Sequence, residues 1–456
     1  MNALTRVAND VIRRRRADVT DPDWKDLQYY LGKELNKLLL EDETALALFE
    51  DRIQEGLSRG QPLRILINTG EAESAALPWE LLTWDKADNP FLAQSQKTPI
   101  ARVVRPLYLA RVWNAREPIR ILVAGASPLG RAPANVQQET VRIQQALKHL
   151  GNRVDVRSCR EVKLTTLTKE MKDYDPHILH VIAHGEPSAI EFENDEGDVR
   201  KVTSQELAER IAFSAPSLSL FVTTACESAM EGSSPRKLSI ARALSKEGVP
   251  AVVAMQFEIR DEIAIKFVHQ FYSNLGHSEN ITTSLTAARL EIKDPLPDSP
   301  EWASPVLFLS HNHERNDVVF SPTIDWVIDR LHQDLKPIQD AYWYLSTFKK
   351  LPHGEFVDAL IDNVNDTTQR LQQLATILGQ DFPANLADCR DTLVRLVPDI
   401  RKSARYILQS LDQYDNKRTD KIEGEFYEKV EDCVKMTGLF ITEFQKLLEL
   451  LNEFFR

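Results

Sequence analysis

A histidine and a cysteine each follow an apolar segment that is typical of a buried β-strand. His184 comes directly after the segment 177–183, and Cys226 comes shortly after the segment 218–223. A thiol becomes a strong nucleophile when it loses its proton, and a neighbouring imidazole can accept that proton. If the two segments are adjacent parallel strands, both side chains lie at the same edge of the sheet. The pattern therefore indicates a cysteine–histidine pair built for nucleophilic attack.

Gly185, directly after the histidine, fits the same chemistry. A residue without a side chain lets a substrate approach the backbone, and its N–H can bind a developing oxyanion together with the N–H of Cys226. The residue types alone leave a structural interpretation open, because a cysteine at a strand end is often a small core residue. A histidine there is often only a hydrogen-bonding group. The functional interpretation depends on the joint pattern, two strand ends each followed by a small or polar turn.

Apolar strands alternate with amphipathic helices through residues 116–312. This order is typical of a mainly parallel sheet with helices on both faces. The apolar runs predict strands at 119–124, 154–158, 177–183, 218–223, 249–255 and 306–309. Helical spacing predicts helices at 135–150, 165–172, 203–212, 238–246, 261–275 and 280–292, with a short hairpin near 189–193. We therefore expect an α/β core whose strand ends carry His184 and Cys226.

Other patterns flank this core on both sides. Residues 1–115 mix predicted helices and strands, namely helices at 24–40 and 43–57, strands near 62–70 and 100–104, and a short helix at 77–82. This α/β region either precedes the core or extends its sheet. Residues 320–456 carry four long segments with helical apolar spacing, which predicts an all-α four-helix bundle.

The composition excludes some classes of partner. A formal net charge of -12 argues against wholesale binding of nucleic acid or of an anionic membrane. No run approaches the roughly 18 uncharged apolar residues of a membrane span, and the N-terminus lacks the apolar core of a signal peptide. The 4 cysteines form no Cys-x-x-Cys pair, so neither zinc nor a disulfide framework is expected. We expect a cytoplasmic protein with reduced thiols.

The remaining motifs predict no cofactor and no metal. The loop 124–131 follows a strand but lacks the glycine and lysine pattern of a phosphate loop. His311 and His313 have no acidic or cysteine cluster beside them, so we interpret them as surface residues. The basic run Arg13–Arg16 is interpreted as a solvated helix end, with an acidic partner as the alternative.

Two segments resemble the catalytic motifs of a known family. His177-Ile-Leu-His-Val-Ile-Ala-His-Gly-Glu-Pro187 and Leu218-Ser-Leu-Phe-Val-Thr-Thr-Ala-Cys-Glu-Ser-Ala229 are similar to the two motifs of the CHAT family, caspase-like cysteine peptidases related to separase, gingipain and the caspases. Further segments resemble the family in the same order along residues 60–312, namely 77–82, 248–256, 261–275 and 302–308. The resemblance implies a caspase-like fold, with His184 as general base and Cys226 as nucleophile.

The resemblance also suggests where substrate choice is made. In separase-like relatives, acidic residues after the strand that follows the cysteine shape the pocket for the side chain before the scissile bond. Glu258 and Asp261 occupy that place and would receive an Arg or Lys. Asp261 also stands where a helix N-cap belongs, which would explain it without any substrate. Arg260 would instead favour an acidic side chain.

These observations predict a regulated cysteine endopeptidase that cleaves a specific protein, in a bacterial defence (including antiviral) or stress-signalling pathway. The bundle at 320–456 would bind a regulatory protein or sensor. One alternative is a catalytically silent CHAT-fold scaffold that acts through its bundle. Another is a flavodoxin-like nucleotide sensor.

Overall fold

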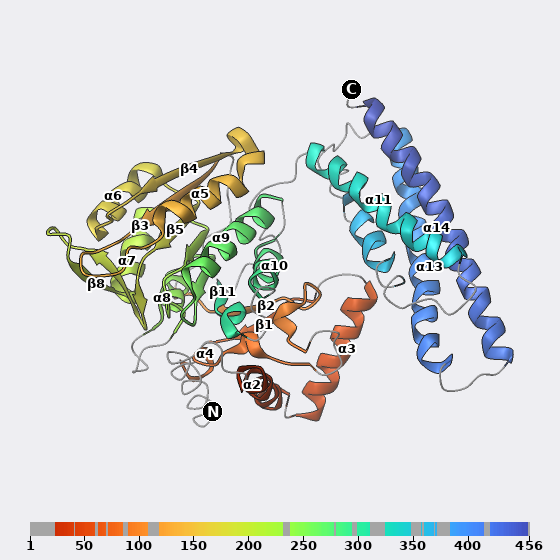
Figure 1. Ribbon diagram of the computed structural model, residues 1–456, viewed down its shortest axis with the longest axis horizontal. Helices are drawn as coiled ribbons and strands as arrows, with labels where there is room; N and C mark the ends of the chain where they lie inside the picture. Colours follow the sequence, from red (N-terminus) through yellow and green to blue (C-terminus); the bar gives the residue numbers. More distant parts are fainter. Residues whose placement is uncertain are drawn as a thin grey trace. The chain divides into compact units, whose positions relative to one another are not determined.

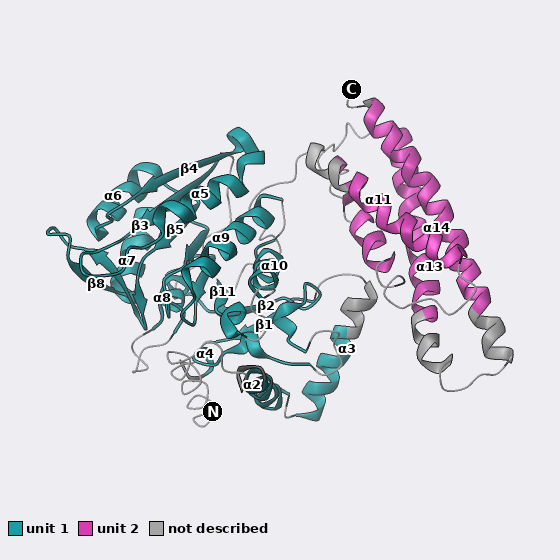
Figure 2. Ribbon diagram, in the orientation of Figure 1, with its two compact units in different colours: residues 1–320 teal, residues 321–456 magenta. Residues whose placement is uncertain are grey.

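The computed structural model describes residues 23–40, 42–59, 63–69, 72–84, 90–107, 118–230, 238–277, 280–293, 299–310, 324–347, 357, 360–368, 370, 371, 384–414 and 420–454. The chain forms two compact units, Met1–Phe320 and Ser321–Arg456, each with its own core (Figure 2).

An eight-stranded sheet forms the centre of the first unit (Figure 1). Its strand order is β1-β2-β11-β10-β9-β5-β3-β4, and every neighbouring pair is parallel except β10 and β11. The strands span β1 Ile65–Asn68, β2 Ile100–Val104, β3 Ile119–Gly125, β4 Val154–Cys159, β5 Ile178–Ile182, β9 Leu220–Thr223, β10 Ala251–Met255 and β11 Pro305–Ser310. The predicted α/β class with a mainly parallel sheet is confirmed, although β9 and β10 each begin two residues later than predicted.

Both faces of the sheet are covered by helices, which explains why its central strands are apolar throughout. Alternate side chains along β9 show the division: Leu220 and Val222 belong to one core cluster, and Phe221 belongs to the other. The first cluster packs under α5 (Val136–Ala146), α9 (Asp261–Gly276) and α10 (Ile281–Lys293). The second packs under α6 (Leu164–Tyr174), α7 (Ser204–Ser214) and α8 (Ile240–Lys246).

The N-terminal region extends this sheet, because β1 and β2 continue it beyond β11. Helices α2 (Asp23–Leu39), α3 (Glu43–Arg59) and α4 (Ala72–Ala75) and the 3₁₀ helix η1 (Trp79–Leu81) also lie in this region. Gly32 of α2 permits a close approach, since a Cβ atom there would lie 2.3 Å from the carbonyl oxygen of Leu81. Residues of both α2 and η1 belong to the same core cluster as the central strands.

A second, smaller sheet begins immediately after His184. It is antiparallel and has the order β6 (Gly185–Glu186), β7 (Ala189–Glu193) and β8 (Val199–Thr203). The predicted hairpin near 189–193 is thus part of a three-stranded sheet. Thr203 caps α7 by accepting a hydrogen bond from the N–H of Glu206 at 3.2 Å, as the Thr-x-x-Glu pattern indicates.

The second unit is helical throughout its described part. Helices α11 (Ile324–Thr347), α13 (Ala384–Tyr414) and α14 (Asp420–Phe454) and helical residues 360–368 bury their apolar stripes in one core. This confirms the all-α character predicted for the region. Asp334 lies in this core beside Arg370, and burial raises the pKa of its carboxyl group to about 6. No helix in the described ranges is long and apolar enough to cross a membrane.

Candidate active site

The parallel pairing of β5 with β9 brings the histidine and cysteine segments together. Val181 pairs with Thr223 in this register. His184 and Cys226 each lie three residues beyond this pair. Both residues therefore follow their strands at the same edge of the sheet and at the same distance along the chain. The parallel pairing therefore brings both residues to the same edge of the sheet, as expected for adjacent parallel strands.

Gly185 packs directly against the backbone that carries the cysteine. A Cβ atom at this position would lie 2.3 Å from the carbonyl oxygen of Cys226 and 3.1 Å from the Cβ of Ala225. Real side chains do not tolerate a separation of 2.3 Å, so only glycine fits. This need for close backbone packing is a reason for glycine that the sequence did not reveal.

The imidazole of His184 is held by a backbone carbonyl. Its Nε2 lies 2.7 Å from the carbonyl oxygen of Ala132, in the loop that joins β3 to α5. A carbonyl can only accept, so Nε2 carries the hydrogen and a neutral ring has its lone pair on Nδ1. A backbone carbonyl has no signature in the sequence, so this orienting group is visible only in the structure.

A buried polar chain fixes the backbone just before Cys226. The hydroxyl of Thr224 lies 3.2 Å and 3.1 Å from the two carboxylate oxygens of Glu139, and Nε2 of His180 lies 3.1 Å from that carboxylate. Nδ1 of His180 lies 3.1 Å from the hydroxyl of Tyr272. Burial, aided by the charge of Glu139, raises the pKa of Tyr272 well above its ordinary value, so that hydroxyl stays protonated and donates. The end of β9 is therefore tied to α5, β5 and α9.

The other three cysteines are poor candidates for a nucleophile. Burial raises the pKa of Cys159 and of Cys433 to about 11 in each case, and it also raises the pKa of Cys389. These thiols are protonated at neutral pH, whereas nucleophilic attack requires the thiolate. Cys226 and Cys159 are each half-buried, whereas Cys389 and Cys433 are buried.

The two acidic residues predicted to bind substrate lie on one short segment after β10. Glu258 and Asp261 are both exposed. The expectation that Asp261 is the N-cap of the following helix was wrong: Arg260 is the N-cap residue, and Asp261 is the first residue of α9. An acidic residue in a first helical turn is still favoured by the helix dipole.

Arg260 is occupied by an internal ion pair. Its guanidinium lies 2.8 Å and 3.1 Å from one carboxylate oxygen of Glu301, and Glu301 is almost fully buried. Its backbone N–H also donates to Glu301 at 2.9 Å. The guanidinium thus already has a buried carboxylate as its counter-charge, while the side chain is 39% exposed.

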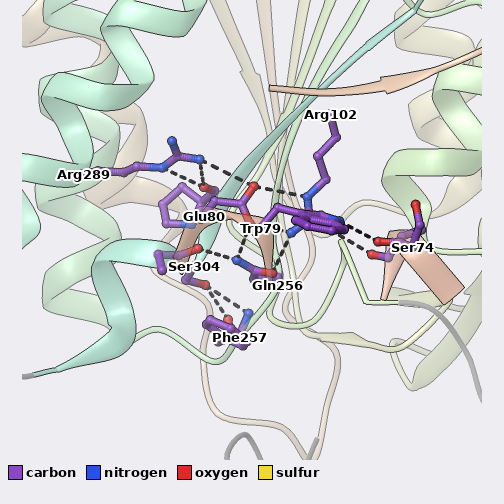
Figure 3. A network of polar contacts seen from close by, with 11 residues as sticks. Ser74, Trp79, Glu80, Arg102, Gln256, Phe257, Arg289 and Ser304 are labelled. Atoms are coloured by element: carbon purple, nitrogen blue, oxygen red, sulfur yellow. Dashed lines mark hydrogen bonds and ion pairs between the residues drawn. The ribbon is translucent and has the colours of Figure 1, made fainter. Parts of the chain in front are cut away.

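A buried ionic network anchors this segment to the N-terminal region (Figure 3). Glu80 accepts hydrogen bonds from Arg102 at 3.1 Å and from the side-chain amide of Gln256 at 2.9 Å. The oxygen of that amide accepts from Arg102 at 2.9 Å. Arg289 also lies 3.9 Å from Glu80, and all four side chains are buried. Helix η1 and the residue that follows β10 thus meet in space, although they are far apart in the sequence.

The network is charged as well as buried. Two guanidinium groups, from Arg102 and Arg289, share the single carboxylate of Glu80. Burial lowers the pKa of Arg289 to about 10. Buried cations depend on such a carboxylate, because removing one partner leaves the others uncompensated. Glu80 is therefore the carboxylate that both guanidinium groups share next to the segment that carries Glu258.

Two further points concern metal binding and the sequence motifs that lie outside the described residues. Across the described residues, no group of three or more His, Cys, Asp or Glu is arranged to hold a metal ion. His311, His313 and the basic run Arg13–Arg16 lie outside the described residues.

The chain is similar to one protein family over most of its first unit. The CHAT domain model matches residues 31–320. Among solved structures, the chain is similar to the Arg specific cysteine proteinase gingipain R, at a TM-score of 0.41 and 11% sequence identity; the match covers 67% of this chain and 77% of that one. The search of curated proteins returned no matching sequence.

We expect Gly185→Ala to separate the two strand ends. The added methyl group would collide with the Cys226 carbonyl, which should cost about 2 kcal/mol of stability and slow alkylation of Cys226. Thermal unfolding and labelling with iodoacetamide measure both effects. Gly438→Ala in the second unit is the control, since its φ is not positive and the added Cβ would meet nothing closer than the ring of Tyr342, at 3.2 Å. Equal behaviour of the two variants would contradict the close packing.

We expect Glu80→Gln to destabilise the first unit by about 3 kcal/mol, because two buried guanidinium groups would lose their counter-charge. The amides of β2 and β10 should then exchange their hydrogens faster than in the wild type, as measured by hydrogen exchange of the full chain. Glu34→Gln is the matched control, since Glu34 pairs with Lys37 on the surface of α2. Its effect should stay below about 1 kcal/mol. Similar exchange rates in the two variants would show that the network does not support the sheet.

Proposed function

Because the CHAT domain model matches more than half of its length, the chain belongs to the CHAT domain family, and we propose that it is a cysteine endopeptidase with Cys226 as nucleophile and His184 as base. At the level of the family, the fold is that of caspase-like cysteine peptidases. The observation that carries the proposal is that the parallel strands β5 and β9 end at the same edge of the sheet, with Gly185 packed against the carbonyl of Cys226.

The arrangement supports a two-stage hydrolysis. Nδ1 of His184 accepts the thiol proton, and Sγ of Cys226 attacks the scissile carbonyl carbon. The N–H groups of Gly185 and Cys226 bind the resulting oxyanion. His184 then gives its proton to the leaving amine, which departs and leaves an acyl-enzyme. Water, deprotonated by His184, attacks the acyl group, and the thiol is restored as the acid leaves.

The exposed acidic pair after β10 supports a preference for basic residues. Glu258 and Asp261 attract an Arg or Lys side chain before the scissile bond. The Glu80–Gln256 contact supports the backbone from which Glu258 projects, and Arg260 does not compete because Glu301 holds it. A pocket for a cation therefore fits this segment better than a pocket for an anion.

The second unit serves as the regulatory part of this proposal. Its helices form a core of their own, so it can bind a protein partner without disturbing the sheet. Trp343 of α11 is 66% exposed, and an exposed tryptophan is a frequent anchor in protein interfaces. We place the protein in the cytoplasm, where a sensor or regulatory protein would release its activity in a bacterial defence or stress pathway.

We expect iodoacetamide at pH 7 to label Cys226 faster than Cys159, Cys389 or Cys433, and His184→Ala to slow this labelling at least about tenfold. The other three thiols act as internal controls, and His332→Ala in the second unit controls for loss of any histidine. If Cys226 were labelled only as fast as Cys389, and if His184→Ala did not change that rate, the scaffold alternative would be supported instead.

We expect proteomic comparison of wild type with Cys226→Ala to reveal cleavage products that end in Arg or Lys. The double variant Glu258→Gln/Asp261→Asn should lower the cleavage rate at these sites by about tenfold or more, because the pocket loses its charge. Products that end in Asp or Glu would overturn the basic preference, and an absence of Cys226-dependent products under activating conditions would oppose the peptidase itself.

A further inference from the structure

The loop between β3 and α5 is fastened to the small sheet by two buried carboxylates. Glu191 binds the guanidinium of Arg131 through two hydrogen bonds, of 2.7 Å and 2.5 Å. Glu193 accepts the backbone N–H of Ser127 at 2.7 Å. Both glutamates lie on β7 and are less than 5% exposed. Buried carboxylates are costly unless they are paired, so the loop and the strand require each other.

Glu191 contacts the proposed base from two directions. Its backbone N–H donates to the carbonyl oxygen of His184 at 2.9 Å. Its carboxylate holds Arg131, the residue directly before Ala132, and the carbonyl of Ala132 accepts the Nε2–H of His184 at 2.7 Å. The contacts therefore form a closed ring from the histidine backbone, through Glu191, Arg131 and Ala132, back to the histidine ring.

This ring adds to the other contacts of the loop, among them the bond of Ser127 to Glu193. Leu129, nearer the loop tip, is 65% exposed and is held by a backbone hydrogen bond from its N–H to the carbonyl of Gly197 at 2.9 Å. The carboxylate of Glu191 is 4% exposed and Arg131 is 46% exposed, and the two-pronged geometry makes this pair more directional than a surface pair with a single contact. Through Arg131, Glu191 thus restrains the residue next to the Ala132 carbonyl.

We propose that Glu191 is a positioning residue: through Arg131 and the Ala132 carbonyl it keeps the hydrogen of His184 on Nε2 and leaves Nδ1 to accept the proton of Cys226. This inference rests on the proposed peptidase function. It makes the small sheet β6–β7–β8 part of the catalytic arrangement, since β7 carries the residue that fixes the histidine.

Glu191→Gln tests the inference in the full chain. Glutamine keeps the size of the side chain and its acceptor oxygen but loses the charge that holds Arg131. We expect iodoacetamide labelling of Cys226 at pH 7 to slow at least about tenfold, with a changed pH profile. In the Cys226→Ala background, nitrogen NMR of labelled histidine should show the hydrogen of His184 shared between Nε2 and Nδ1 instead of confined to Nε2.

Two further variants separate positioning from general damage. Glu186→Gln removes the neighbouring ion pair of Glu186 with Lys201 on the same small sheet, at 2.6 Å, and should leave labelling and tautomer unchanged. Arg131→Lys keeps the charge opposite Glu191 but cannot bond in the same two-pronged way, so it should give an intermediate rate. It also tests the ring if Glu191→Gln unfolds the protein.

The outcomes distinguish this inference from the function on which it rests. The positioning role would be overturned if Glu191→Gln and Arg131→Lys both kept the labelling rate, pH profile and tautomer of the wild type. His184→Ala would still slow the labelling in that case. If His184→Ala has no effect on labelling, the peptidase proposal fails. In that case the NMR tautomer still reports whether Glu191 governs the histidine ring.

Discussion

The parallel pairing of β5 with β9 is the constraint on which the site depends. Two segments separated by more than thirty residues end at the same edge, with His184 and Cys226 equally far beyond a paired position. The fit is tight enough that Gly185 has no room for a side chain beside the Cys226 carbonyl. Every other feature of the site either holds one of these strand ends or supports the surface around it.

Buried polar groups hold this edge of the sheet from several sides. Glu139 fixes the turn before Cys226, Glu191 fixes the loop that contacts His184, and Glu80 fixes the segment after β10. Burying charge is expensive and adds little net stability compared with apolar packing. Its contribution here is geometric, because hydrogen bonds to carboxylates restrict direction as well as distance. The N-terminal region is part of this support, because Glu80 belongs to that region and its partner Gln256 belongs to the core.

The sequence predicted much of the scaffold and the placement of His184 and Cys226 just beyond two strands. Apolar runs located the strands of the sheet to within about two residues in most cases, and helical spacing identified the helices on both faces and in the second unit. These signals are local, because each strand or helix must present apolar side chains with its own period. The motifs around His184 and Cys226 were visible for the same reason, since each directly follows a strand. The N-cap at Asp261 was placed one residue too late, as helix boundaries depend on single hydrogen bonds.

What only the tertiary structure decided is how those residues are held. The contacts of Glu80 with Gln256, of Arg131 with Glu191 and of His184 with Ala132 join positions that are 176, 60 and 52 residues apart. No local period encodes such pairs. The partner of His184 is a backbone carbonyl, a group that every residue carries. The amino-acid type at position 132 therefore does not indicate this contact. The sequence by itself thus determined which side chains stand at the strand ends, and the packing of distant segments determined which nitrogen of the histidine faces the Ala132 carbonyl.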